Sequence, residues 1–151
     1  MFTSQSLRAV PKPGSVGFTE HRLDDVVHQI DVAGVLEDIG ELGRRIDAAL
    51  AAGVRWLILD LSEVAVVSDL VLEGLVDAAG ALRARKGELI VAGAHRHVAE
   101  RLAAYDVAHR PAVAANVDQA VMILKMLRPK TDIRRAKQRI TSLTLPRIEP
   151  R

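Results

Sequence analysis

The chain carries the stretch VRWLILDLSEVAVVSDLVLEGL at residues 54–75, and the fold class follows largely from it. Its first eight residues, VRWLILDL, are nearly all apolar and include β-branched and aromatic side chains. A run of this kind is typical of a central strand that is covered on both faces. A second apolar stretch occupies residues 64–67, and Ser68 and Asp69 then offer caps for a helix from residue 70 to about residue 86. The stretch therefore predicts a buried strand followed by an amphipathic helix.

A β-hairpin is predicted upstream of this stretch. Strand-like pieces at residues 18–23 and 26–33 are separated by Asp24 and Asp25, which suit a tight turn. We expect Gly34 to break the second of these strands, because glycine interrupts strand patterns. The hairpin then adds two strands to the sheet before the first helix.

A helix is predicted after the hairpin, because apolar residues recur there at spacings of three and four. Asp38 can cap this helix, which runs to about residue 52, and Gly53 follows it in the position of a C′ glycine. The recurring residues form one apolar stripe, which we expect to face the core: Ile39, Leu42, Ile46 and Leu50.

Strands and helices alternate through the following part of the chain. Residues 89–91 are predicted as a core strand, residues 97–104 as a helix and residues 112–114 as a short strand. Asn116 can cap a last helix, with Gln119 three residues later in a capping-box arrangement. This alternation implies an α/β fold with a mixed, mainly parallel central sheet, about four helices and right-handed crossovers.

The length and composition fit one domain with two tails. The chain has 151 residues, of which 49% are hydrophobic, so it can bury one core. We expect a flexible arm at residues 1–15, the folded domain at residues 16–127 and a flexible basic tail at residues 128–151. The absence of Cys excludes disulfides and thiolate sites, and no stretch approaches the length of a membrane span. We therefore expect a cytoplasmic protein that does not enter a membrane.

The charge of the chain is distributed unevenly. The net charge is +2, but the residues from Arg128 onward hold eight basic and two acidic side chains. The body before them is mildly acidic and is a poor candidate for a nucleic-acid surface. The basic tail has no interleaved aromatic residues, so a solvated tail is expected and nucleic-acid binding is the weaker interpretation.

No motif of an enzyme class is present in the sequence. It contains no GxGxxG, no phosphate-binding P-loop and no GxSxG elbow. His95 and His97 are two residues apart, and no third ligand nearby completes a metal site, so we interpret them as polar residues at a helix start. We therefore expect no catalytic residue, no metal and no cofactor.

Several segments resemble the STAS domains of bacterial anti-sigma factor antagonists. In that family a core strand ends in Asp-Leu-Ser, as at residues 60–62 here, and an apolar run and an amphipathic helix follow. Residues 34–37 resemble the family's Gly-Glu-Leu-Asp segment, and residues 86–93 resemble its G-x-L-x-L-x-G strand. Residues 117–120 resemble the start of its last helix. The resemblance spans roughly residues 16–127 and implies a protein-binding regulator with a STAS-like single domain.

The chain departs from the family pattern at the functional centre. The family has an Asp-Ser-Ser-Gly turn, whose first Ser is phosphorylated by a partner that is both a kinase and an anti-sigma factor. This chain has Ser68, Asp69, Leu70 and Val71 there, so Asp69 stands at the position of the phosphorylated Ser. Because phosphate adds about 1.5 to 2 negative charges, Asp69 either imitates the phosphorylated state in part or only caps the helix. Ser68 is an alternative phosphoacceptor, displaced by one residue.

The resemblance also implies where a partner binds. We expect the docking residues on the turn after the central strand and on the segment before the first long helix: Gly34, Glu37, Ser68, Asp69, Leu70, Val71 and Leu72. The expected partner is an anti-sigma factor with a serine kinase-like fold, or another STAS protein. Two alternatives stay open, namely a STAS-type ligand sensor and a scaffold subunit of a stress-signalling complex.

Overall fold

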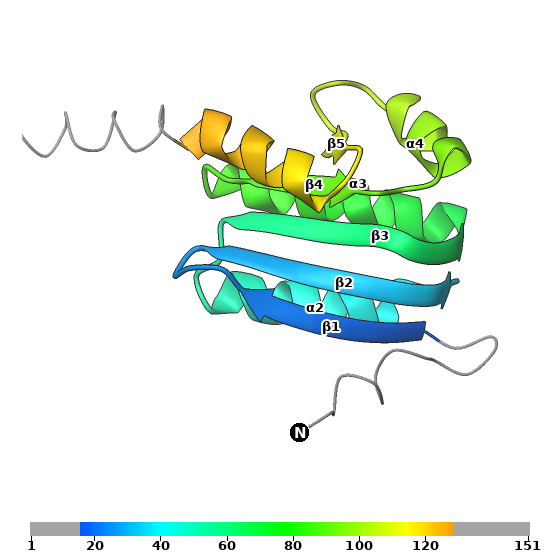
Figure 1. Cartoon of the computed structure of the whole chain (residues 1–151), viewed down its shortest axis with the longest axis horizontal. Coiled ribbons are helices and arrows are strands. Elements are labelled where there is room, and N and C mark those ends of the chain that lie inside the picture. The colour runs from blue at the N-terminus through cyan, green and yellow to red at the C-terminus, as the bar shows by residue number, and fades with distance from the viewer. Residues whose placement is uncertain (1–15, 129–151) are drawn as a thin grey trace, which may run out of the picture.

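The computed structural model describes residues 16–128, which form a five-stranded sheet with helices on both faces (Figure 1). The expected arm at residues 1–15 and the expected tail at residues 128–151, except for Arg128, lie outside the described residues; Arg128 is helical and pairs with Asp24. The strands are β1 (Val16–Arg22), β2 (Val27–Leu36), β3 (Trp56–Val67), β4 (Glu88–Ala92) and β5 (Ala112–Ala114). The helices are α2 (Gly40–Ala51), α3 (Asp69–Ala84), α4 (Arg96–Ala103) and a further helix at residues 117–128.

The strand order in the sheet is the order in the sequence, β1-β2-β3-β4-β5. β1 and β2 form an antiparallel hairpin, and every later pair of neighbours is parallel. Parallel neighbours need a crossover, and α2, α3 and α4 supply these connections. The α/β class, the hairpin and the mainly parallel sheet are therefore confirmed.

The hairpin turn is held by Asp24, as its position in the sequence predicts. Its Oδ1 atom accepts hydrogen bonds from the backbone N–H groups of Val26 at 2.9 Å and Val27 at 3.0 Å. A short acidic side chain that bonds to the backbone two residues later stabilises a turn without help from the core.

Gly34 does not end β2, so the predicted strand break is wrong. The strand continues to Leu36, and its register to β3 shifts between Gly34 and Val35. Gly34 has a φ of 108°, a backbone conformation that residues with a Cβ atom rarely adopt. The glycine therefore permits an irregularity inside a continuous strand instead of terminating it.

β3 is one continuous strand of 12 residues, although the polar residues Ser62 and Glu63 suggest two separate pieces. Its register to β2 shifts near these residues, between Asp31 and Ala33 of β2, which accommodates the polar interruption. β4 pairs with β3 only from Trp56 to Asp60 of β3, while β2 follows β3 to its end.

Asp38 is not the N-cap of α2, which corrects a second prediction. The N-cap is Ile39, and Asp38 instead accepts a hydrogen bond from the backbone N–H of Gly40 at 2.9 Å. The predicted end of the helix is confirmed, because Gly53 has a φ of 96° and donates its N–H to the carbonyl of Leu50 at 3.1 Å.

The helix at residues 117–128 begins as predicted. Asn116 accepts a hydrogen bond on its Oδ1 atom from the backbone N–H of Gln119 at 2.8 Å. The side chain of Gln119 reaches back to the N–H of Ala115 at 2.5 Å, one residue before the position that a standard capping box uses.

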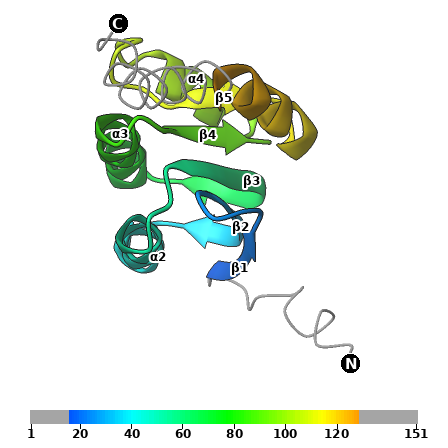
Figure 2. The same ribbon diagram turned by 90° about the vertical axis from the view of Figure 1, so that its left-hand side faces the viewer.

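Both faces of the sheet are covered, which explains why β3 is almost entirely apolar. On one face Leu57 packs with Leu42 of α2 and Leu75 of α3, and on the other Ile58 packs with Leu124 of the helix at residues 117–128. Figure 2 shows α2 and α3 on one side of the sheet and the last helix on the other. Each buried Leu or Ile side chain stabilises the fold by roughly 1.5–3 kcal/mol.

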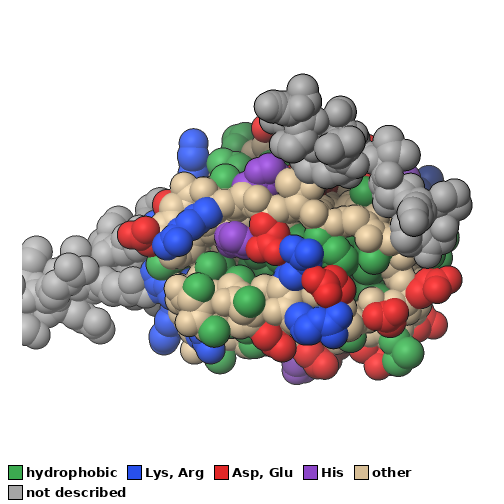
Figure 3. All heavy atoms as spheres, turned by 90° about the horizontal axis from the view of Figure 1, so that it is seen from below, with side chains coloured by type: hydrophobic (Ala, Val, Ile, Leu, Met, Phe, Trp, Pro, Cys, Tyr) green, Lys and Arg blue, Asp and Glu red, His purple; other side chains and the backbone are tan. Residues whose placement is uncertain are grey.

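The surface around β1 and α2 carries interspersed charges, as Figure 3 shows from that side. Glu20 of β1 pairs with Arg45 of α2, and Arg45 also pairs with Glu41 at 3.0 Å. Across residues 16–128, none of the helices combines the length and the hydropathy that a membrane span requires.

Candidate functional site

The carboxyl ends of β2 and β3 lie side by side and bring Glu37 next to Ser68. Leu36 is paired with Val67 in the parallel register, so the loops after both strands leave the sheet at the same edge. The backbone N–H of Ser68 donates to the carbonyl of Leu36 at 3.1 Å, and the Ser68 hydroxyl donates to the carbonyl of Glu37 at 2.7 Å. The structure therefore joins two of the predicted docking segments, which are far apart in the sequence.

Ser68 is the N-cap of α3. Its backbone is extended, with φ −79° and ψ 163°, and its hydroxyl accepts a hydrogen bond from the N–H of Val71 at 3.3 Å. The hydroxyl thus donates to one backbone group and accepts from another. Since α3 begins at Asp69, one residue earlier than predicted, the interpretation of Asp69 as the helix cap is wrong.

The side chain of Asp69 lies at the surface, 86% exposed, and pairs with Arg101 of α4. An acidic group in the first turn of a helix also interacts favourably with the helix dipole. The Arg101 guanidinium donates a second hydrogen bond to the carbonyl of Val67 at 3.0 Å. One arginine therefore links α4 to the end of β3 and to the start of α3.

Sequence reasoning did not identify Arg101. It lies 32 positions after Asp69, with a strand and a loop between the two helices, and its local pattern is that of an ordinary basic residue near a helix end. Only the tertiary packing of α4 brings it to the site.

The predicted docking residues of α3 divide between surface and core. Leu70 is 68% exposed, whereas Val71 and Leu72 are 0% and 2% exposed and belong to the main apolar cluster. Val71 and Leu72 therefore present no side chain to a partner in this structure, which corrects the prediction for these two positions.

The helical period accounts for this division. The exposed residues Glu73, Asp77 and Gly80 follow Leu70 at spacings of three, four and three, so Leu70 shares the solvent face of α3. This helical spacing can be read from the sequence alone. It indicates that Leu70 is an apolar residue on the otherwise polar, solvent-facing side of α3.

Gly34, which was predicted as a docking residue, is not part of this surface. It lies within β2, between Val16 of β1 and Val64 of β3, and is half-buried. Its contribution is the backbone irregularity described above. Glu37, three residues later, is exposed as predicted.

Three acidic residues lie at the same junction as Leu70 or one helical turn away from it. Glu37 and Asp69 are exposed at the junction, and Glu73 lies one helical turn after Asp69 on the same face of α3. Arg101 offsets part of this charge through its ion pair with Asp69. We refer to Glu37, Ser68, Asp69, Leu70 and Glu73 as the proposed docking surface; it has one exposed apolar residue, Leu70, and three acidic residues.

The histidines near the start of α4 do not form a metal site with other residues that the structure describes. The rings of His95 and His97 are stacked, with their centroids 6.1 Å apart, and both residues are exposed. Over residues 16–128, no group of three or more His, Asp or Glu side chains is arranged to hold a metal ion.

A family model for the STAS domain matches residues 36–120 of the chain. The match begins at the last residue of β2 and extends into the helix at residues 117–128, so it includes all five residues of the docking surface. No curated protein sequence matches the chain significantly.

Solved structures of anti-sigma factor antagonists have a similar fold. A variant of RsbS from Moorella thermoacetica aligns with a TM-score of 0.62 and 19% identity, covering 74% of this chain and 97% of that one. The anti-sigma factor antagonist SpoIIAA, a Bacillus cell fate determinant, aligns in its unphosphorylated form with a TM-score of 0.59 and 13% identity, covering 72% and 98%. An anti-sigma factor antagonist from Mycobacterium paratuberculosis aligns with a TM-score of 0.56 and 18% identity, covering 77% and 99%. At these identities the likeness establishes the fold.

Proposed function

The chain belongs to the STAS domain family, and we propose on this basis that it is a protein-binding regulator of the anti-sigma factor antagonist kind and not an enzyme. The proposed partner is an anti-sigma factor with a serine kinase-like fold, or another STAS protein, in the cytoplasm. The observation that carries the proposal is the exposure of Leu70, a large apolar side chain, at the first turn of α3.

The docking surface is held rigid before any partner arrives. Ser68 bonds to the loop after β2 and to the first turn of α3, and Arg101 bonds to the end of β3. A backbone that is already held by such bonds needs little further ordering when a partner binds, so less of the binding free energy is lost to entropy. Burying a large apolar side chain such as Leu70 in a partner also contributes favourably, because apolar surface leaves water.

The charge of the docking surface indicates what the partner presents. The surface has three acidic residues, Glu37, Asp69 and Glu73, with Arg101 as the partial counter-charge. Complementary charge steers two proteins together and selects between partners. The proposed partner therefore offers an apolar pocket bordered by Lys or Arg side chains.

Asp69 replaces the phosphoacceptor that the family resemblance places at this position, so we propose that the surface carries a fixed charge there. Ser68 is a poor substitute acceptor, because its hydroxyl already donates to Glu37 and accepts from Val71. A phosphate on Ser68 would remove the donated bond and add negative charge beside Asp69. The proposed contact is therefore independent of phosphorylation.

The test is a binding titration with the partner that co-purifies from the native cell, expressed separately and measured by calorimetry. Leu70→Glu places a charge at the exposed apolar residue and is expected to weaken binding roughly 30-fold or more. The matched control is Val107→Glu, since Val107 is 74% exposed and lies after α4, outside the docking surface. Val107→Glu is expected to bind like the parent chain.

Asp69→Ser and Asp69→Ala separate the roles of the acidic residue. If Asp69 contributes charge to the contact, both variants change the affinity and its dependence on salt. If Leu70→Glu binds as tightly as the parent chain, the docking surface is in the wrong place. Mass spectrometry that finds Ser68 phosphorylated in the purified complex would contradict the proposed independence from phosphorylation.

A further inference from the structure

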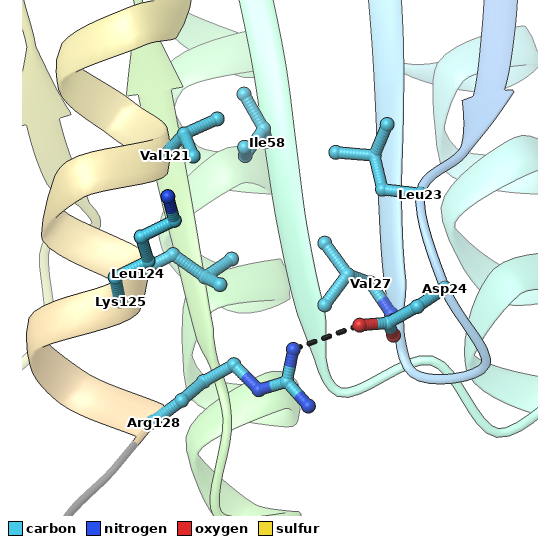
Figure 4. A pocket seen from close by; sticks show the side chains of 8 residues that line it. All are labelled: Leu23, Asp24, Val27, Ile58, Val121, Leu124, Lys125 and Arg128. Atoms are coloured by element: carbon cyan, nitrogen blue, oxygen red, sulfur yellow. Dashed lines mark hydrogen bonds and ion pairs between the residues drawn. The ribbon is translucent and has the colours of Figure 1, made fainter.

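A pocket of about 340 Å³ lies between the helix at residues 117–128 and the first halves of β2 and β3 (Figure 4). Its wall is apolar, formed by Val27 of β2, Ile58 of β3, and Val121 and Leu124 of the helix. The pocket is on the sheet face opposite α2 and α3 and near the strand starts, whereas the docking surface lies at the strand ends (Figure 1). It is therefore a separate feature of the molecule.

The pocket is kept open by the elements that frame it. The side chains of Val27 and Ile58 belong to neighbouring strands, and Leu124 joins them in one buried cluster. Arg128, at the end of the helix, pairs with Asp24 of the hairpin turn at 2.8 Å and so ties the helix across the sheet. A volume near 340 Å³ is at the small end of the range for ligand sites, about 300–1,000 Å³.

One end of the pocket is basic. The residues that line the pocket include two basic side chains, Lys125 and Arg128, and one acidic side chain, Asp24. The lining therefore has a net positive charge. The Nε atom of Arg128 is shielded from solvent and has no hydrogen-bond partner within the described residues. Figure 4 shows the Arg128 side chain reaching across towards Asp24, whereas the Lys125 side chain runs along the helix towards Val121. The guanidinium of Arg128 is already paired with Asp24, so Lys125 supplies the remaining positive charge at the pocket.

We propose that this pocket binds a small carboxylate with an unbranched apolar chain, of the medium-chain fatty acid class. The chain would pack on Val121 and on Leu23 of the hairpin turn, which is 47% exposed and also lines the pocket, and the carboxylate would accept a hydrogen bond from Lys125. An apolar wall disfavours sugars and nucleotides, because their hydroxyl groups would lose water without gaining partners. The excess positive charge disfavours cationic amphiphiles.

Calorimetry of the full chain measures occupancy, and the fluorescence of Trp56 is a second readout. Trp56 is the chain's single tryptophan, and it is buried in the same cluster as Val27 and Ile58. Titration of the full chain with octanoate is expected to give a saturable binding heat and a saturable change in fluorescence. Octan-1-ol and octylamine have the same chain without the negative charge. We expect their affinity to be lower than that of octanoate by a factor of roughly ten or more.

Two pairs of variants test the basic end and the apolar wall. Lys125→Gln is expected to weaken octanoate binding several-fold, whereas Lys86→Gln, an identical change at an exposed position after α3, is expected to leave it unchanged. Val121→Phe fills the cavity and is expected to abolish binding, whereas Met122→Phe adds a similar ring at the adjacent exposed position and is expected to leave it unchanged. Circular dichroism verifies that each variant is folded.

Three outcomes would overturn the proposal. The first is a full chain that gives no saturable binding heat with octanoate. The second is equal binding of octanoate and octan-1-ol, which would show an apolar cavity without selection for a carboxylate. The third is a folded Val121→Phe variant that binds octanoate like the parent chain, which would place the ligand elsewhere. None of these results depends on the proposed partner of the docking surface.

Discussion

The hydroxyl of Ser68 donates to the carbonyl oxygen of Glu37 at 2.7 Å, and this bond joins the loop after β2 to the start of α3. The two residues come from segments that are adjacent only because β2 and β3 are parallel neighbours. A single side chain thus both begins a helix and fixes the loop beside it. The geometry of the docking surface depends on this bond.

Ser68→Ala is expected to destabilise the protein by about 1 kcal/mol, because α3 loses its N-cap and the carbonyl of Glu37 loses its donor. Urea denaturation followed by circular dichroism measures the change. Ser68→Asp keeps an acceptor for the helix but cannot donate to Glu37, so it is expected to recover part of the loss. An Ala variant as stable as the parent would show that neither bond contributes.

Gly87→Ala is expected to destabilise the protein by about 3 kcal/mol or to prevent folding. A Cβ atom built at Gly87 would lie 1.6 Å from the carbonyl oxygen of Arg55, which is backbone and cannot rotate away. Gly80→Ala is the matched control, because a Cβ atom there meets nothing within 4 Å and Gly80 lies inside α3. It is expected to stabilise the protein by about 0.5–1 kcal/mol, since alanine favours the helix. Thermal midpoints that move in the same direction for both variants would contradict this reasoning.

Acid is expected to remove a stabilising contribution from Glu20. The hydrogen bond from His28 is the main reason that the pKa of Glu20 is lowered below 4.5, with Arg45 adding to the effect and burial opposing it. The folded state therefore favours the ionised carboxylate. Its stabilisation is present above the unfolded pKa and is lost as the pH falls through the lower folded pKa.

The measurement is the thermal midpoint of the parent chain and of Glu20→Gln between pH 7 and pH 3. The parent is expected to be the more stable at pH 7, and the difference is expected to shrink as Glu20 becomes protonated. In a His28→Gln variant the pKa of Glu20 should rise towards its usual value, so the contribution of Glu20 should be smaller and its loss should be complete at a higher pH. A difference that stays constant from pH 7 to pH 3 would contradict the assignment.

The order of strands and helices was predictable from the sequence because it depends on local periodicity. The apolar run at residues 54–61 is buried on both faces, and the spacing of Ile39 to Leu50 matches the face of α2 that packs on the sheet. Turn and cap residues such as Asp24 and Asn116 act within three residues of their own position, so their roles could also be predicted.

The errors arose where a local pattern has two physical outcomes. Gly34 can end a strand or allow a bulge, and only the neighbouring strands decide which occurs. Asp38 could cap a helix, but the first turn of α2 starts one residue later and leaves it bonded to Gly40. Val71 and Leu72 were assigned by family resemblance, while the helical period of α3 indicates burial.

Arg101 could not have been predicted, because its role depends on the packing of α4 beside the end of β3. The pocket beneath the helix at residues 117–128 is a further example. Its apolar lining residues read as ordinary core positions, and the space between them exists only in three dimensions.

The bond from Arg101 to the carbonyl of Val67 has a consequence for how the sheet meets other chains. After Asp60, β3 still pairs with β2 but no longer pairs with β4. The side of β3 that faced β4 therefore resembles the edge of a sheet over these residues. Such edges attract strands from other molecules and promote aggregation. By occupying the last carbonyl of that edge with a bulky cation, Arg101 disfavours the addition of an extra strand at this corner. Removing Arg101 would then expose the chain to self-association through its backbone.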